Sequence, residues 1–240
     1  MKSPSPPVTG RWLPDLTIDD YLRWPAFQSK SAQGKRFTAT VRDVLDTIES
    51  DSLIEPRFAY RTYDIAGIGN DWIDLGNGPR ISDFPVTRCR LERARIFTAA
   101  VGTLGPKLEK CAADWFRQKA GLKAFALIEI GTATLFGLSN FIKATLADLA
   151  RARRFGLGVS ISPGNREIGL EHQRLMVALA GGEEIGVRVS SGAMMSPVNS
   201  LSMAYGAGPG MVPHQTLECE ICDARERCRF RKVALAEAAT

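Results

Sequence analysis

The sequence predicts an α+β fold in which helices pack on a twisted antiparallel sheet. Strand-like segments and helix-like segments occur in groups along the chain, without the strict alternation of a parallel βαβ sheet. Turns rich in Gly and Pro separate short segments of β-branched and aromatic residues, as is typical of antiparallel strands. A third observation is the segment 123–153, which is apolar on nearly all sides through its first half and therefore predicts a helix inside the core.

The composition is that of a folded protein. The chain has 240 residues, 45% of them hydrophobic, with 31 Lys and Arg against 26 Asp and Glu. A chain of this length buries about 70–75% of its surface on folding, so its stability requires neither a disulfide nor a metal. No run of about 18 uninterrupted apolar residues occurs, which predicts no membrane span. The odd number of cysteines and the lack of a secretory start predict a cytoplasmic location.

Changes in composition along the chain predict three regions. Residues 1–37, with four Pro among the first 15, predict an extended N-terminal arm. Residues 38–210 form the α+β domain, and residues 211–240 form a Cys-rich metal-binding tail.

The first half of the domain carries one helix and several strands. Apolar residues at helical spacing predict a helix over 38–49. Segments 58–65, 72–75 and 80–81 predict strands of a small antiparallel sheet. The buried run 96–101 predicts a further strand.

The second half begins with a helix after Gly105-Pro106 that ends at Gly121. One face of this helix carries Leu108, Cys111, Ala112, Trp115 and Phe116. In the next helix, 123–153, Gly131 and Gly137 permit close packing. Beyond it the patterns predict strands over 159–161, 185–189 and 200–204, with an amphipathic helix over 170–179.

Basic residues gather in two places, and each has a local explanation. Arg151, Arg153 and Arg154 end an apolar helical pattern, where cations complement the helix dipole. The second group overlaps the C-terminal cysteines, where positive charge favours thiolates. The net charge of +5 therefore does not predict a nucleic-acid partner.

Five blocks of sequence resemble the activation domain of cobalamin-dependent methionine synthase and its stand-alone relatives. The blocks are FTAAVGTLG (97–105), IEIGTATLFG (128–137), VSISPGN (159–165), EIGVRVSSGAMMSP (184–197) and NSLSMAYG (199–206). The resemblance implies an α+β fold that binds S-adenosylmethionine and docks over a corrinoid carrier while cob(II)alamin is reductively remethylated. A corrinoid carrier protein or a methyltransferase subunit is the implied partner.

Ligand-facing positions of the family motif are changed in this chain. The family pattern Arg-x-Ser-Pro-Gly-Tyr reads Ser160-Ile161-Ser162-Pro163-Gly164-Asn165, so the turn is kept while the cation and the aromatic ring are lost. The pattern Met-x-Pro-x-Lys-Ser becomes Met195 to Ser200, with Asn199 replacing the cation. Binding of S-adenosylmethionine is therefore doubtful, although a remodelled site for another small molecule is compatible with these residues.

The acidic positions of the family also differ. Glu129 lies two residues before Gly131, shifted by one position, and Phe136 follows where the relatives carry a second acid. A carboxylate among apolar neighbours must meet a cation, water or a ligand, or else its pKa must rise. For Glu129 we expect either an ion pair with an Arg of the strand region or contact with a ligand.

Three cysteines near the C-terminus have the spacing of a metal site. Cys219-x2-Cys222-x5-Cys228 brings three thiolates within reach of one ion, and His214 precedes them. Zinc would take His214 as its fourth ligand. An iron–sulfur cluster would take three Cys, with a fourth ligand from His214, Cys89, Cys111 or a partner, or none. Stand-alone relatives of the activation domain often end in a similar tail, which favours the cluster; free surface thiols are the remaining alternative.

The other cysteine and histidine residues are predicted to have structural positions, either buried in the core or exposed at the surface. Cys89 and Cys111 are predicted to be small buried hydrophobic side chains. His172 has no partner at metal spacing and is predicted to lie at the surface.

Three functions remain open at this stage. The first is a corrinoid-associated protein that docks on or reductively services a cobalamin carrier during methyl transfer. The second is a catalytic component of a corrinoid- or folate-dependent methyltransferase or demethylase, and the third is a non-catalytic zinc-bearing interaction module. No catalytic Ser-His-Asp or Cys-His arrangement is visible with two His in the chain, which argues against a hydrolase.

Overall fold

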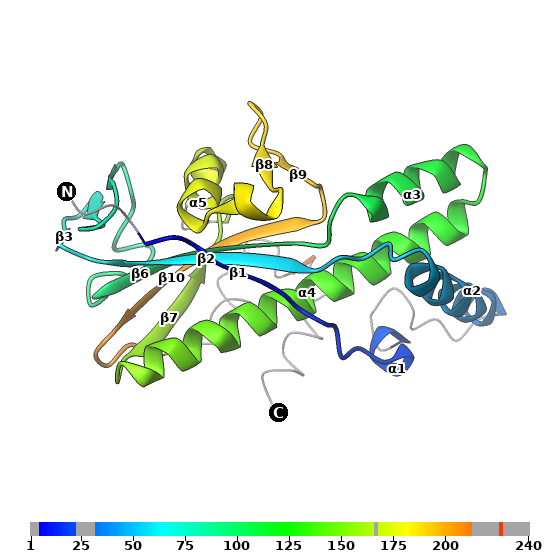
Figure 1. Ribbon diagram of the computed structural model, residues 1–240, viewed down its shortest axis with the longest axis horizontal. Helices are drawn as coiled ribbons and strands as arrows, with labels where there is room; N and C mark the ends of the chain where they lie inside the picture. The colour runs from blue at the N-terminus through cyan, green and yellow to red at the C-terminus, as the bar shows by residue number, and fades with distance from the viewer. Residues whose placement is uncertain (1–4, 23–31, 166–167, 213–225, 228–240) are drawn as a thin grey trace.

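The computed structural model describes residues 5–22, 32–165, 168–212 and 226–227. Its centre is a five-stranded antiparallel sheet with the strand order β1-β2-β6-β10-β7 (Figure 1). The strands are β1 (Val8–Arg11), β2 (Arg57–Asp64), β6 (Ile96–Thr103), β10 (Ser200–Gly208) and β7 (Gly156–Ile161). The predicted α+β class with an antiparallel sheet is confirmed.

The strands of the central sheet define its two ends. At one end, called here the Thr103 end, Thr103 of β6 pairs with Arg57 and Ser200. At the other, called the Gly208 end, Gly208 of β10 pairs with Gly156 of β7. All eight residues of β6 are buried, as expected for a central strand covered on both faces.

Strand β10 is longer than its predicted span, 200–204. The structure extends it through Tyr205-Gly206-Ala207-Gly208, although two glycines in four residues are more typical of a turn than of a strand. In the structure these glycines lie where other parts of the chain touch the sheet: a Cβ on Gly206 would overlap the side chain of Leu91, and one on Gly208 would overlap the Arg93 carbonyl oxygen. Close approach of neighbouring segments, and not a turn, explains these glycines.

Helix α4 (Gly121–Ala152) covers one face of the sheet, while α2 (Ala32–Ser50) and α3 (Lys107–Arg117) pack against α4 beyond the Thr103 end (Figure 1). The predicted close packing at both glycines of α4 is confirmed. A Cβ on Gly131 would lie 2.6 Å from Leu108 Cδ1, and one on Gly137 would lie 2.7 Å from the Trp12 ring. The prediction for α3 was wrong at its end, because the helix stops at Arg117 and leaves Phe116 53% exposed.

The opposite face carries α5 (Gln173–Ala180) and a second sheet, formed by β3 (Gly67–Ile68), β4 (Trp72–Asp74) and β5 (Arg80–Ser82). The predicted antiparallel pairing of 72–75 with 80–81 is confirmed, but the predicted strand 58–65 belongs to the five-stranded sheet, as β2, because it pairs with β6. A short helix, α1 (Ile18–Leu22), follows β1 in the chain.

The predicted strand over 185–189 is shortened at its start, where a 3-10 turn, Gly182–Ile185, and Gly186 precede it. Only Arg188–Val189 is extended, as β8, paired with β9 (Met195–Ser196). The physical reason is that Gly181 and Gly186 bracket the turn with left-handed φ angles of 79° and 80°. Likewise, the predicted helix 170–179 divides into a 3-10 turn, Leu170–His172, and α5.

Helix α4 is long and apolar enough to cross a membrane by length and composition alone. The core helix of a soluble protein passes the same test, and half of its most apolar window is buried in the protein. The helix packs against β6, β7 and β10, so it is accounted for as part of the core.

Candidate functional site

The turn predicted over Ser162–Asn165 is present and directly follows β7. The Asn165 amide donates to the Ser162 carbonyl (3.1 Å), and the Gly164 amide donates to the Ile168 carbonyl (3.0 Å). Gly164 has a φ of 89°, which disfavours any residue with a side chain. The turn therefore presents Gly164 as exposed backbone, and Pro163 is half-buried beside it.

Two predicted site residues belong to the helical face of the sheet. Ser160 is the cross-strand partner of Tyr205, whose side chain belongs to the core cluster that contains α4. Directly paired residues project from the same face, so Ser160 lies on the side that α4 covers. Glu129 of α4 is 1% exposed, which confirms a carboxylate in the core. Its pairing with an Arg or a ligand stays a prediction.

The residues of the second motif, Met195 to Ser200, lie in two different places. Met195 pairs with Val189 in the β8–β9 hairpin and packs against the core on the α5 side of the sheet. Asn199 lies at the Thr103 end, where its backbone carbonyl accepts a hydrogen bond from the Leu104 amide (2.9 Å). Met195 and Glu129 therefore belong to opposite sides of the sheet, which the linear motif does not reveal.

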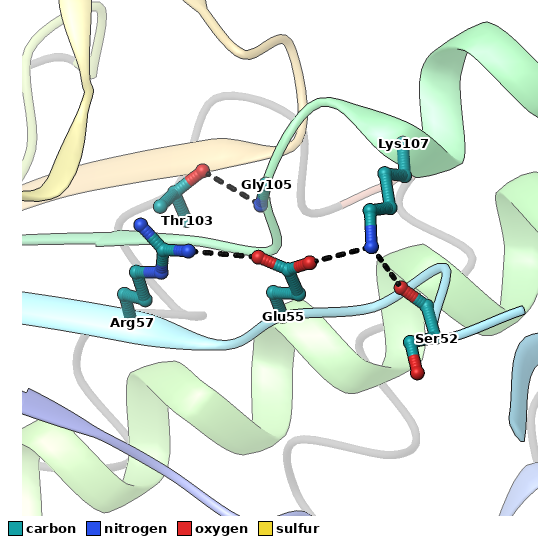
Figure 2. Close-up of polar contacts among 6 residues, drawn as sticks. All are labelled: Ser52, Glu55, Arg57, Thr103, Gly105 and Lys107. Atoms are coloured by element: carbon teal, nitrogen blue, oxygen red, sulfur yellow. Dashed lines mark hydrogen bonds and ion pairs between the residues drawn. The ribbon is translucent and has the colours of Figure 1, made fainter.

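Next to Asn199 the structure shows an ionic cluster that sequence reasoning missed, formed by Glu55, Arg57 and Lys107 (Figure 2). Arg57 Nη2 lies 2.7 Å from Glu55 Oε2, and Lys107 Nζ lies 2.7 Å from Glu55 Oε1. Lys107 also donates to the Ser52 carbonyl (3.3 Å). With two cations and one carboxylate, the cluster carries a net positive charge at the Thr103 end of the sheet, where Asn199 also lies.

Hydroxyl groups extend the polar contacts at the Thr103 end. The Gly105 amide donates to the Thr103 hydroxyl (3.1 Å), which lies 2.8 Å from the Ser200 hydroxyl (Figure 2 shows the first contact). The Ser200 hydroxyl is also 2.7 Å from the Pro197 carbonyl oxygen. These contacts connect β6 to β10, so the backbone around Asn199 is fixed by several independent bonds.

The charge of Glu55 makes a testable contribution to stability. The hydrogen bond from Lys107 is the main cause that lowers the pKa of Glu55 below its ordinary value of 4.5. A lowered pKa stabilises the folded state above the ordinary value, and the stabilisation is lost as the pH falls through the folded-state pKa. Because the three side chains are 34–48% exposed, we expect Glu55→Gln to reduce the free energy of unfolding by only about 0.5–1 kcal/mol at pH 7.

Urea unfolding at several pH values checks this expectation. The difference between Glu55→Gln and the wild type should be constant from neutral pH down to about pH 5 and should shrink below 4.5, the ordinary carboxyl pKa. Glu49→Gln is the matched control, because Glu49 is an exposed carboxylate of α2 with no ion pair to the described part of the chain. A difference that grows on acidification would contradict the proposed ion pairs.

The predicted metal ligands Cys219, Cys222, Cys228 and His214 lie outside the described residues. Within residues 5–22, 32–165, 168–212 and 226–227, no group of three or more His, Cys, Asp or Glu side chains could hold a metal ion. The packing prediction for the other two cysteines is confirmed: Cys89 is 1% exposed, and Cys111 packs at the edge of the core. Burial raises the pKa of the Cys111 thiol, which disfavours a reactive thiolate there.

The surface prediction for His172 was wrong. Its side chain is 12% exposed, and its ring lies edge-on to Phe84 with 5.8 Å between the ring centres. The cause is the 3-10 turn Leu170–His172, which precedes α5 where sequence periodicity predicted a regular helix. No spacing signal indicated this contact, because Phe84 belongs to the distant loop after β5.

Comparison with known proteins supports the fold. No protein-family model and no curated protein matches the sequence. A crystal structure of the MetH reactivation domain bound to AdoHcy is similar with a TM-score of 0.61, over 88% of this chain and 82% of that one. The two sequences are 13% identical, a level at which the likeness concerns the fold. This chain therefore has the fold of the MetH reactivation domain.

Proposed function

We propose that this chain is a corrinoid-associated protein that docks on a cobalamin carrier and services it reductively during methyl transfer. The observation that carries the proposal is the fold shared with a reactivation domain over 88% of the chain. Five sequence blocks that resemble the methionine synthase activation domain support the same association. They include the Pro163-Gly164 turn at the end of β7.

The small-molecule site of this fold is remodelled in our proposal. Gly164 keeps a backbone that a ligand could approach closely. Ser160 and Asn165, however, offer neither the guanidinium nor the aromatic ring of the family motif. A charge-assisted hydrogen bond is worth about 1.5–3 kcal/mol, so the loss of the cation alone weakens binding by about tenfold to a hundredfold. We therefore propose a retained scaffold with weak affinity for S-adenosylmethionine.

We assign the redox role in this proposal to the C-terminal tail. Cys219, Cys222 and Cys228, with His214 as a candidate fourth ligand, would hold an iron–sulfur cluster, or zinc as the alternative. A cluster would supply single electrons to a carrier-bound corrinoid. The Arg and Lys residues of the tail would offset the negative charge of the thiolates. We infer this metal site from the spacing of the three cysteines in the sequence.

Association with a corrinoid carrier tests the proposal. The full chain, purified without oxygen, is mixed with a methionine-synthase-type carrier domain loaded with cob(II)alamin, and complex formation is followed by sedimentation and by the corrinoid absorbance. We expect a complex with the loaded carrier, and a weaker one with the same carrier lacking cobalamin. If neither the loaded carrier nor free cobalamin binds, the proposed function is wrong.

Titration with S-adenosylmethionine tests the remodelled site separately. We expect no saturation at micromolar ligand, because the chain lacks both side chains that the family motif supplies. Calorimetry on the isolated full chain gives the measurement, with S-adenosylhomocysteine as the second ligand. Micromolar binding of either ligand would contradict our interpretation of Ser160 and Asn165 and would leave the carrier association to be judged by its own experiment.

A further inference from the structure

A groove at the Gly208 end has the features of a ligand site. It has a volume of about 510 Å³ and contains none of the site residues that the sequence predicts. Three segments line it: Arg90, Glu92 and Arg93 of the loop before β6, Gly158 and Val159 of the edge strand β7, and Gly210, Met211 and Val212 after β10. This volume is within the range of about 300–1,000 Å³ that small-molecule sites occupy.

The arginine side of the groove is held rigidly. In the loop before β6, Cys89, Leu91 and Ala94 are at most 1% exposed, so their side chains anchor the loop to the core. The Cys89 amide donates to the Pro85 carbonyl (2.9 Å), and the Ala94 amide donates to the Leu91 carbonyl (2.9 Å). The anchored residues alternate with Arg90, Glu92 and Arg93, which are exposed.

Glycines of the central sheet bring both sides of the groove close to its strands. A Cβ on Gly158 would lie 2.7 Å from Met211 Cε, and one on Gly208 would overlap the Arg93 carbonyl oxygen. Without these glycines, neither Met211 nor the loop that carries Arg90 and Arg93, called here the arginine loop, could lie directly on the sheet. These glycines therefore allow the loop before β6 and the Met211 side chain to lie directly against the strands beside the groove.

The guanidinium groups are available to a ligand. Among the residues that the structure describes, Arg90 and Arg93 form no ion pair or side-chain hydrogen bond. Arg90 also holds a left-handed backbone with a φ of 55°, which is uncommon for a residue with a side chain. Two unpaired guanidinium groups on one rigid loop match an anion with several oxygen atoms.

We propose that this groove binds a small phosphorylated ligand of mononucleotide size. The phosphate group contacts Arg90 and Arg93, and the less polar part of the ligand packs against Val159 and Met211. Glu92 lines the same side and repels the phosphate, so it limits the affinity for simple anions. The site is distinct from the turn after β7, and the proposal does not depend on the corrinoid function.

Binding of AMP to the full chain tests the proposal, with adenosine and inorganic phosphate as partial ligands. Calorimetry in low salt should show AMP binding at least about tenfold tighter than adenosine, because adenosine lacks the charge that the arginines recognise. Inorganic phosphate should compete with AMP at higher concentration. Arg93→Gln and Arg90→Asn should each weaken AMP binding about fivefold to tenfold. Asn is chosen at position 90 because it tolerates the left-handed backbone.

Two further variants separate a specific site from general attraction to positive charge. Arg88→Gln removes the same charge from an exposed residue of the same loop that does not line the groove, and should change AMP affinity less than about twofold. Glu92→Gln should tighten binding about twofold to threefold, because it removes the repulsion. Thermal unfolding confirms that each variant is folded. Absence of AMP binding, equal binding of adenosine, or an equal loss in Arg88→Gln would each overturn the proposal.

Discussion

Gly208→Ala should lower the midpoint of thermal unfolding by about 6–12 °C. The Cβ atom introduced by this substitution would overlap the Arg93 carbonyl oxygen and would lie 3.2 Å from Ala94 Cα. These are backbone atoms, so no side-chain rotation relieves the overlap, and the loop before β6 must separate from the sheet. Overpacking of this kind costs about 1–3 kcal/mol, and we expect the upper part of that range. For a chain of this size each kcal/mol shifts the midpoint by about 2–4 °C.

Gly121→Ala is the matched control, because it adds the same methyl group at another glycine. Gly121 begins α4, where a Cβ would touch only a Phe116 ring atom at 4.0 Å. Alanine favours helix over glycine by up to about 1 kcal/mol, so this variant should be neutral or slightly more stable. Calorimetric scans of both variants give the comparison. Equal midpoints for Gly208→Ala and the wild type would show that the arginine loop does not lie on β10 as described.

Cys222→Ser should strongly weaken metal binding by the tail. Structural metal sites of this kind bind with about 10–16 kcal/mol, so the loss of one of four ligands removes about 3 kcal/mol or more. Affinity then falls by more than about a hundredfold, and the purified protein should contain much less metal than the wild type. Anaerobic purification followed by iron and zinc analysis gives the measurement. Absorbance near 400 nm that bleaches on reduction would identify iron–sulfur and exclude the zinc module.

Cys111→Ala is the appropriate comparison for that variant. The Cys111 side chain packs at the edge of the core on α3, and its thiol pKa is raised by burial. Its removal should leave the metal content unchanged. A wild-type protein that contains no iron or zinc after anaerobic purification would contradict the tail site, whatever the variants do.

The elements that sequence predicted well are those whose pattern is local. The buried run that became β6 and the apolar helix α4 each carry their signal within one continuous segment. Gly131 was correctly assigned to close packing, because a glycine weakens a helix and its presence in an apolar one indicates a neighbour that needs the space. By contrast, the last four residues of β10 were missed, since their glycines serve contacts with a loop more than 100 residues earlier.

The sequence predicted the turn of the candidate site, but it did not predict which other residues lie around the site. The Pro163-Gly164 pair sets its own backbone, so Ser162–Asn165 was identified from four adjacent residues. The cluster of Glu55, Arg57 and Lys107 requires the start of β2 to meet the start of α3, 52 positions along the chain, and no periodicity encodes that meeting. The face on which Met195 lies depends in the same way on the pairing of β9 with β8.

Met211, seated on Gly158 beside β7, fixes the point from which the tail departs. Six residues lie between Val212 and Cys219, so their Cα atoms are seven steps apart, and an extended chain spans at most about 3.3–3.6 Å per step. Cys219, the first cysteine that we propose as a metal ligand, is therefore tethered within about 25 Å of Val212. The six residues of β7 span about 20 Å, at about 3.3 Å each. The tether is thus long enough for the metal centre that we propose for the tail to reach the Pro163-Gly164 turn at the far end of β7.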